Sequence, residues 1–278
     1  MTDGQCPPPT IIARIRRDAI LVATGLALLF IACASVVVLT TLRPGALGVD
    51  LHSYLDAARS WLAGDGYYHA RQLAGPYDIV GAESPYGADT LYPPTILWLL
   101  VPFTVLPEVL WWAVPAALFG AAMWRLRPSS GARLGILILL ALPASLSSIV
   151  QGNPVIWVAS LTALGMAYGW GGAFVLLKPS LFPFALAGIT GRRWWYVVAV
   201  MAVLTVPLMP LLLEYPSVIL NSRGGGLLYS VRDVPLLLAP LVAWFGSATR
   251  APWPAVHPGH APKAGAGSAT VHPPGPRD

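Results

Sequence analysis

Long apolar segments without charged side chains run through most of this sequence, and they constrain its fold more than any other feature. The first of them, Ala19–Leu42, contains no Asp, Glu, Lys or Arg. A helix of this length, rising about 1.5 Å per residue, crosses the ~30 Å hydrocarbon core of a bilayer. Only 10% of the 278 residues are charged and 56% are hydrophobic, whereas soluble domains carry roughly 25% charged residues. The sequence therefore predicts an integral membrane protein rather than a soluble, disordered or nucleic-acid-binding chain.

The apolar segments predict an all-α, polytopic membrane protein with about eight transmembrane helices. The run that begins at Tyr92 is too long for one span, and Leu106-Pro107-Glu108 is its natural break. The residues from Glu214 to Asp233 form the expected last loop. The predicted spans are residues 19–42, 93–106, 109–126, 134–149, 154–170, 172–189, 194–213 and 234–246.

Basic residues predict how these spans are oriented in the membrane. Arginines 14, 16 and 17 precede the first span, and cytoplasmic loops carry an excess of Lys and Arg. Residues 1–18 are therefore expected in the cytoplasm and residues 43–91 in a first extracytoplasmic loop. Alternation of eight spans also puts Arg125, Arg127 and Arg133 outside, against the rule. Either segment 93–106 does not fully cross, or the rule is overridden locally.

Outside the transmembrane domain, residues 19–246, two further regions have a distinct composition. The Pro/Gly-rich tail, residues 247–278, is expected to be disordered. The outer loop holds half of the acidic residues and several tyrosines. Within it, residues 51–62 show helical spacing of apolar side chains, which predicts a short helix on the membrane surface, ended by Gly64-Asp65-Gly66.

Three polar positions are candidates for chemistry. Lys178 lies inside the predicted apolar helix 172–189, where a charge is costly; it is either functional or a snorkelling or structurally paired lysine. Gln151-Gly-Asn153-Pro154 lies between two predicted spans and suits ligand binding and a helix-capping turn equally. Asp50 follows the first span and is either a general base or, as is commoner for a loop acid, a helix cap or solvated side chain.

The order of these motifs resembles that of the GT87 family of polyprenyl-phosphate-sugar-dependent glycosyltransferases, which have the GT-C membrane fold. The resemblance extends from about Ala19 to Trp195. It depends on the order and spacing of several short motifs: Asp50-Leu-His52-Ser-Tyr54, Asp65-Gly-Tyr67-Tyr68, Tyr92-Pro-Pro94, Gln151-Gly-Asn153, Lys178-Pro179 and Gly191-Arg-Arg-Trp194.

The resemblance implies a sugar transfer, most often of mannose or arabinofuranose, from a polyprenyl-phosphate donor to a glycolipid or cell-envelope glycan at the outer membrane face. Asp50 would be the general base of an inverting reaction, and Lys178 or Arg223 would bind the donor phosphate. Implied substrate contacts are His52, Tyr54, Tyr92, Gln151 and Asn153. No cofactor or nucleic-acid partner is expected, no metal-ligating residue is assigned, and the sequence contains no Gly-rich phosphate loop. Asp50-Leu-His52 matches paired metal-binding acids poorly, so the sequence leaves metal dependence open.

The sequence also departs from this family, because members usually have more spans after the Arg-Arg-Trp region. We expect a divergent or C-terminally shortened member. The alternative is a non-catalytic membrane protein, such as a small transporter or a subunit of an envelope complex, or an inactive shortened relative. A transporter needs polar groups from several helices around a cavity at the membrane midplane, whereas a transferase needs its carboxylate at the membrane face beside a groove for the lipid.

Overall fold

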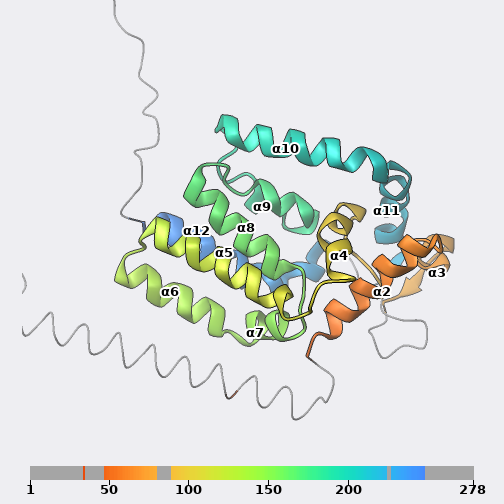
Figure 1. Cartoon of the computed structure of the whole chain (residues 1–278), viewed down its shortest axis with the longest axis horizontal. Coiled ribbons are helices and arrows are strands. Elements are labelled where there is room, and N and C mark those ends of the chain that lie inside the picture. Colours follow the sequence, from red (N-terminus) through yellow and green to blue (C-terminus); the bar gives the residue numbers. More distant parts are fainter. Residues whose placement is uncertain (1–33, 35–46, 80–88, 224–226, 248–278) are drawn as a thin grey trace, which may run out of the picture.

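The computed structural model describes residues 34, 47–79, 89–223 and 227–247, which are mostly helical (Figure 1). The predicted cytoplasmic segment 1–18, nearly all of the predicted first span 19–42 and nearly all of the tail 247–278 lie outside the described residues. The helices are α2 (Val49–Ala63), α3 (Ala70–Ala74), α4 (Leu97–Phe103), α5 (Leu110–Leu126), α6 (Ser130–Ala141), α7 (Pro143–Val150), α8 (Val155–Tyr168), α9 (Phe182–Ala185), α10 (Arg192–Thr205), α11 (Met209–Asn221) and α12 (Val234–Phe245).

Short 3-10 segments connect several of these helices: η1 (Pro94–Ile96), η2 (Ala173–Leu177), η3 (Pro179–Leu181), η4 (Val206–Leu208) and η5 (Leu227–Asp233). Strands β1 (Tyr77–Asp78) and β2 (Ser222–Arg223) pair in parallel and tie the segment after α3 to the end of α11. The all-α class is confirmed for the described residues.

Helix α8 is the centre of the packing. It is buried on nearly all sides, and α5 and α12 pack against it, while α6 packs on the far side of α12 (Figure 1). The absence of a polar face on α8 explains this position, because a helix that is apolar all round has no side to present to water. The main core also includes Trp111 of α5, Leu51 and Leu55 of α2 and Leu97 of α4.

Most of the predicted helices appear near their predicted bounds. The amphipathic pattern of residues 51–62 forms α2, and Gly64 ends it in the left-handed conformation, with its N–H bonded to the carbonyls of Ser60 and Trp61. Segment 134–149 is broken into α6 and α7, which meet at 64°. The break falls at Leu142, before Pro143, because a residue that precedes proline disfavours the helical region.

The prediction of one helix over residues 172–189 is wrong. The chain there forms η2, η3 and the four-residue α9. Two features explain the break. Pro179 and Pro183 cannot donate backbone hydrogen bonds. Gly171 and Gly172 lie directly against the backbone of Ala187 and Phe184, so the beginning and the end of the segment fold against each other. The expected loop from Glu214 is also wrong in its first part, because α11 continues to Asn221.

Eight membrane spans are not supported by the described helices. Among the described residues, one continuous helix, α10–η4–α11 from Arg192 to Asn221, is long and apolar enough to cross a bilayer, and the bent pair α6–α7 adds a second at most. The others are shorter, with 17 residues in α5, 14 in α8 and 12 in α12. The apolar face of α10–α11 is open, with Leu213 and Leu220 74% and 83% exposed.

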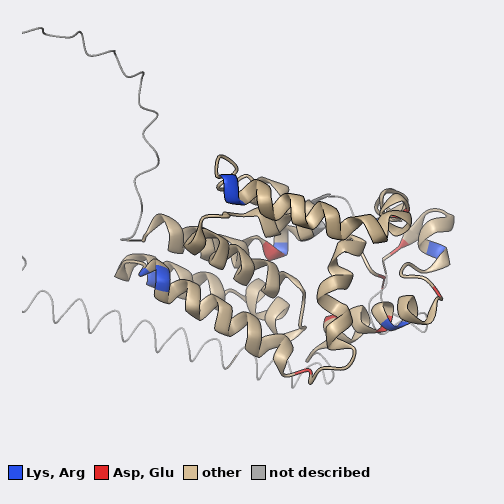
Figure 2. Cartoon of the chain, turned by 45° about the horizontal axis from the view of Figure 1, so that its top comes forward, with Lys and Arg blue, Asp and Glu red and all other residues tan. Residues whose placement is uncertain are grey.

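Figure 2 shows basic side chains alone at one end of the described structure, whereas acidic and basic side chains lie together toward the other end. At one end, Arg125 lies 5.9 Å from the ring centroid of Tyr168, and Arg193 donates a hydrogen bond to the Tyr168 carbonyl at 2.6 Å. Pro128 pairs there with Ser247. We call this the arginine end; it joins the C-termini of α5, α8 and α12 to the start of α10. The opposite ends of α5 and α8 lie beside α2, which contacts Glu108 through His52 and the Gln151 carbonyl through Asp50.

Candidate functional site

A chain of hydrogen bonds joins four of the residues predicted from the sequence, although they come from four separate segments. The Lys178 Nζ donates to the Tyr92 hydroxyl at 2.9 Å, and this hydroxyl donates to Asn153 Oδ1 at 2.7 Å. Asn153 Nδ2 then donates to Asp50 Oδ2 at 2.8 Å. Segments that lie more than a hundred residues apart therefore meet at one polar site within an apolar molecule.

The chemistry of Lys178 sets the direction of this chain. An ammonium group only donates hydrogen bonds, so the Tyr92 hydroxyl accepts from it and has its own proton left to donate. That proton goes to the amide oxygen of Asn153, and the amide nitrogen then faces Asp50. The carboxylate of Asp50 thus receives a donor on Oδ2.

Asp233, which the sequence analysis missed, neutralises Lys178. Its Oδ2 lies 2.5 Å from Lys178 Nζ, and its Oδ1 accepts a hydrogen bond from Ser148 Oγ at 3.0 Å. The two side chains are 2% and 9% exposed. The position of Asp233, directly before the apolar segment 234–246, was the available signal, because a buried lysine requires a carboxylate partner. Lys178 lies between η2 and η3, not in the middle of a helix as predicted.

Backbone contacts fix Asp50 at the first turn of α2. The amide N–H groups of Asp50 and Leu51 both donate to the Gln151 carbonyl, at 2.9 and 3.2 Å, so one loop oxygen satisfies two of the unpaired donors that begin a helix. Gly152 follows in the left-handed conformation, φ 71°. Its carbonyl accepts a hydrogen bond from the Trp111 indole at 2.8 Å. The turn between α7 and α8 is therefore rigidly attached to α2.

The environment of Asp50 favours a carboxyl group that can exchange a proton. Its side chain is half-buried, and this burial raises the pKa of the Asp50 carboxyl above its ordinary value of 3.8. The hydrogen bond from Asn153 and the charges of Lys178 and Arg232 lower the same pKa, whereas the charge of Asp233 raises it. Arg232 is exposed and was not among the predicted residues. A base with a raised pKa and partial exposure suits proton abstraction.

The other predicted residues differ in their relation to this site. Tyr54 packs edge-on against Tyr92, with ring centroids 5.2 Å apart. The contribution of Gln151 in this structure is its backbone carbonyl. The exposed His52 lies 3.1 Å from Glu108. Arg223 is exposed in β2, opposite Asp78, so the structure does not bring it together with Lys178.

An apolar cavity begins close to this site. It measures about 290 Å³ and lies between α5, α6, α7, α8 and α12. Ile149 and Leu236 line it, and they lie beside Ser148 and close to Asp233 in the chain. Ser160 is the one hydroxyl-bearing residue of its lining. The described residues contain no group of three or more His, Cys, Asp or Glu side chains placed to hold a metal ion.

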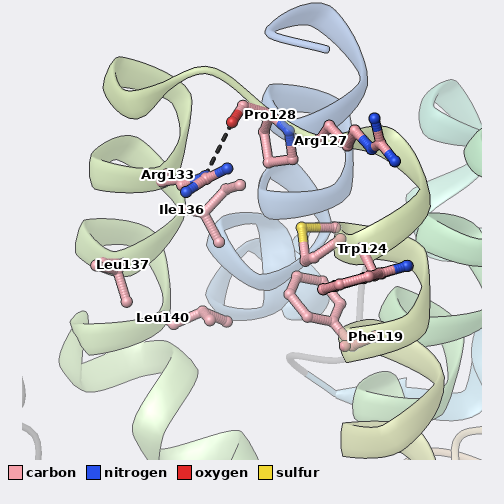
Figure 3. A pocket seen from close by; sticks show the side chains of 10 residues that line it. Phe119, Trp124, Arg127, Pro128, Arg133, Ile136, Leu137 and Leu140 are labelled. Carbon is pink, nitrogen blue, oxygen red and sulfur yellow. Dashed lines mark hydrogen bonds between the residues drawn. The ribbon is translucent and has the colours of Figure 1, made fainter. Parts of the chain in front are cut away.

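A larger groove of about 770 Å³ runs between α5 and α6 and continues from this cavity (Figure 3). The two spaces share Phe119 and Leu140 in their linings. Together they extend from the neighbourhood of Ser148 toward the arginine end of the molecule.

Comparisons with known proteins returned no similar protein: no family model matches the chain, and no curated protein or solved structure matches it either. The GT87 resemblance of the sequence motifs therefore remains a hypothesis, and a function for this chain has to be argued from the geometry of its site.

Proposed function

We propose that this chain is a membrane glycosyltransferase that moves a sugar from a polyprenyl-phosphate donor to a glycolipid or cell-envelope glycan acceptor. The observation that carries the proposal is the placement of Asp50. A half-buried carboxylate with a raised pKa is held by Asn153 in a chain of hydrogen bonds, close to an apolar cavity. Each of these features is what a lipid-linked donor and a hydroxyl acceptor require.

In this mechanism Asp50 is the general base. Asn153 holds Oδ2, and the carboxylate takes the proton of the acceptor hydroxyl as its oxygen attacks the anomeric carbon of the donor. The new glycosidic bond forms as the bond from the anomeric carbon to the phosphate oxygen breaks, and the configuration inverts. Polyprenyl phosphate leaves with the electron pair of the broken bond.

The leaving phosphate needs a positive charge, and we assign this role to Arg232 rather than to Lys178 or Arg223. The charge of Lys178 is matched by Asp233 at 2.5 Å. Arg232 is exposed next to Asp233 in the chain, and its charge lowers the pKa of the Asp50 carboxyl. We assign Lys178 to the positioning of Tyr92 and Asn153, and Arg232 to the donor phosphate.

We further propose that the Asp50 side faces the cell exterior and the arginine end faces the cytoplasm. Pro94–Phe103 is too short to cross a bilayer, which favours the first of the two alternatives left open by the sequence: segment 93–106 does not cross. The helix α5 then runs inward and carries Arg125 and Arg127 to the cytoplasmic face, in agreement with the positive-inside rule. In this arrangement the short helices cross with the help of their connecting segments.

The lining of the cavity favours a transferase over a transporter. A transporter binds its cargo with polar groups at the midplane, whereas the cavity between α5, α6, α7, α8 and α12 is apolar apart from Ser160. Such a space suits the isoprenoid tail of a donor whose sugar lies at Asp50 and whose phosphate lies at Arg232.

The experiment that tests the proposal compares two Asp→Asn variants on the same helix. Asp50→Asn keeps the size of the side chain but cannot accept the proton, so transfer from a radiolabelled polyprenyl-phosphate sugar should fall by roughly 10²–10⁴-fold. Asp56→Asn is the matched control, because Asp56 is exposed and bonds to Arg59 at 2.8 Å, and its transfer rate should be nearly unchanged.

The pH profile of the wild-type protein gives a second reading of the same assay. The active form of Asp50 is the carboxylate, and its pKa is raised, so transfer should be lost as the pH falls through a value above 3.8. Full transfer by Asp50→Asn, or its loss in Asp56→Asn, would show that another group is the base.

A further inference from the structure

The groove between α5 and α6 has a chemical asymmetry that the proposed reaction does not use. Phe119, Ile136, Leu137 and Leu140 line its length, whereas Arg127 and Arg133 lie at one end of it (Figure 3). The Nε of Arg133 donates to the Pro128 carbonyl at 2.9 Å, which fixes this guanidinium at the edge of the groove. A long apolar lining with cations at one end complements a molecule that has an apolar chain and one anionic head.

The surroundings of these arginines strengthen the charge argument. Arg125 and Arg193 lie near them at the arginine end, and the acidic side chains of the described residues lie toward the other end (Figure 2). No described carboxylate thus forms an ion pair with Arg127 or Arg133. Trp124 also lines the groove and is 82% exposed; tryptophan is enriched where a membrane protein meets the headgroup region.

We propose that this groove binds one anionic phospholipid from the leaflet at the arginine end, with its phosphate at the end that Arg127 and Arg133 line and an acyl chain along Ile136 and Leu137. Charge-assisted hydrogen bonds from guanidinium groups bind phosphate strongly, and polybasic sites at the cytoplasmic side of membrane helices select anionic lipids. This inference rests on the proposed membrane location, but it does not depend on the catalytic role of Asp50.

Gly120 offers a variant that closes the groove without disturbing the fold. It lines the groove, and a Cβ added there would meet nothing within 4 Å. Gly120→Leu therefore fills space that the lipid would occupy, and it replaces a poor helix former with a good one. Gly131→Leu is the matched control, since Gly131 also has nothing within 4 Å but does not line the groove.

The measurement is native mass spectrometry of the full chain released from detergent with added phosphatidylglycerol or phosphatidylcholine. The wild type and Gly131→Leu should retain one phosphatidylglycerol, and Gly120→Leu should retain it at least about tenfold less. A double variant, Arg127→Asn with Arg133→Gln, should lose the preference for phosphatidylglycerol by about tenfold. Asn suits position 127 because the backbone there is left-handed, φ 50°.

Equal retention by Gly120→Leu and Gly131→Leu would overturn the proposal, and so would an unchanged lipid preference in the arginine double variant. The transfer assay is scored separately. Normal phosphatidylglycerol retention in a wild type that transfers no sugar would count against the glycosyltransferase and leave the lipid site standing. Transfer activity in a wild type that shows no preference for phosphatidylglycerol would count against the lipid site and leave the glycosyltransferase standing.

Discussion

Lys178 shows at the scale of a single residue how a costly charge is kept inside an apolar protein. The ammonium is 2% exposed, its charge is matched by Asp233, and it lies 4.6 Å from the ring centroid of Tyr92. A buried ion pair of this kind adds little net stability, but removal of one partner leaves the other charge without compensation. The site therefore depends on both residues. The pair also holds the Lys178 ammonium where it donates a hydrogen bond to the Tyr92 hydroxyl.

The dependence of the site on both Lys178 and Asp233 can be tested by measuring stability, without an activity assay. Lys178→Met should lower the free energy of unfolding by about 3–5 kcal/mol, because Asp233 is left buried and unpaired. The double variant Lys178→Met/Asp233→Asn should recover most of that loss. Thermal unfolding of the purified chain measures both, with Arg59→Met as a control whose exposed pair with Asp56 contributes under about 1 kcal/mol.

A double variant that is no more stable than Lys178→Met would show that the lysine stabilises the core by some means other than its charge pairing.

The residues of the polar chain were predictable one by one, but their connections were not. Lys178 was singled out because a charge inside an apolar segment is costly, Asn153 as part of a polar turn between two predicted spans, Asp50 as a loop acid after the first span, and Tyr92 through the family resemblance alone. Sequence spacing carries no information on which of them touch, and the pairing of Lys178 with Asp233 spans 55 residues. For the same reason Arg223 was chosen as a phosphate ligand, although it lies in β2 opposite Asp78.

At the scale of elements, the position of α2 depends on the turn between α7 and α8. The Gln151 carbonyl accepts from the first N–H groups of α2, and Gly48 N–H donates to the Val150 carbonyl at 2.9 Å. A Cβ on Gly152 would lie 2.9 Å from the Cβ of Leu51. The backbone of this turn, rather than the side chain of Gln151, therefore places Asp50.

Gly152→Ala should for this reason destabilise the protein by about 1–3 kcal/mol, since it adds both a left-handed alanine and a contact that pushes α2 away. Gly64→Ala isolates the first effect, because Gly64 has φ 90° but open space around it. Gln151→Ala should change stability by less than about 0.5 kcal/mol. Thermal unfolding of the three variants ranks them; a Gln151→Ala loss as large as that of Gly152→Ala would mean that the amide side chain holds the turn.

Helical spacing predicted α2, and apolar runs predicted α5 and α8, but an apolar run failed where close backbone approach decides the structure. Segments 51–62, 109–126 and 154–170 form α2, α5 and α8 within a few residues. Segment 172–189 is equally apolar, but Gly171 and Gly172 allow it to fold back on itself, and apolarity alone does not distinguish the two outcomes.

At the scale of the whole molecule, the separation of charge and the length of the helices together limit how the chain sits in a membrane. The continuous α10–η4–α11 helix is exposed and apolar along 30 residues, and its first residue, Arg192, lies at the arginine end with the C-termini of α5 and α12. Composition predicted a membrane protein, but counting apolar segments overestimated the helices long enough to cross, because several are short and packed around α8.

The proposed orientation leads to a labelling experiment on intact cells. In a background of Cys6→Ser and Cys33→Ala, a cysteine is placed at exposed Ala63, at the end of α2, or at exposed Ser130, at the arginine end. An impermeant maleimide should label Ala63→Cys in intact cells and Ser130→Cys only after permeabilisation, because basic segments stay in the cytoplasm. Labelling of both from outside would place the arginine end outside and contradict the inward direction of α5. Labelling of neither until permeabilisation would put Asp50 in the cytoplasm, away from the face at which the lipid-linked donor is expected.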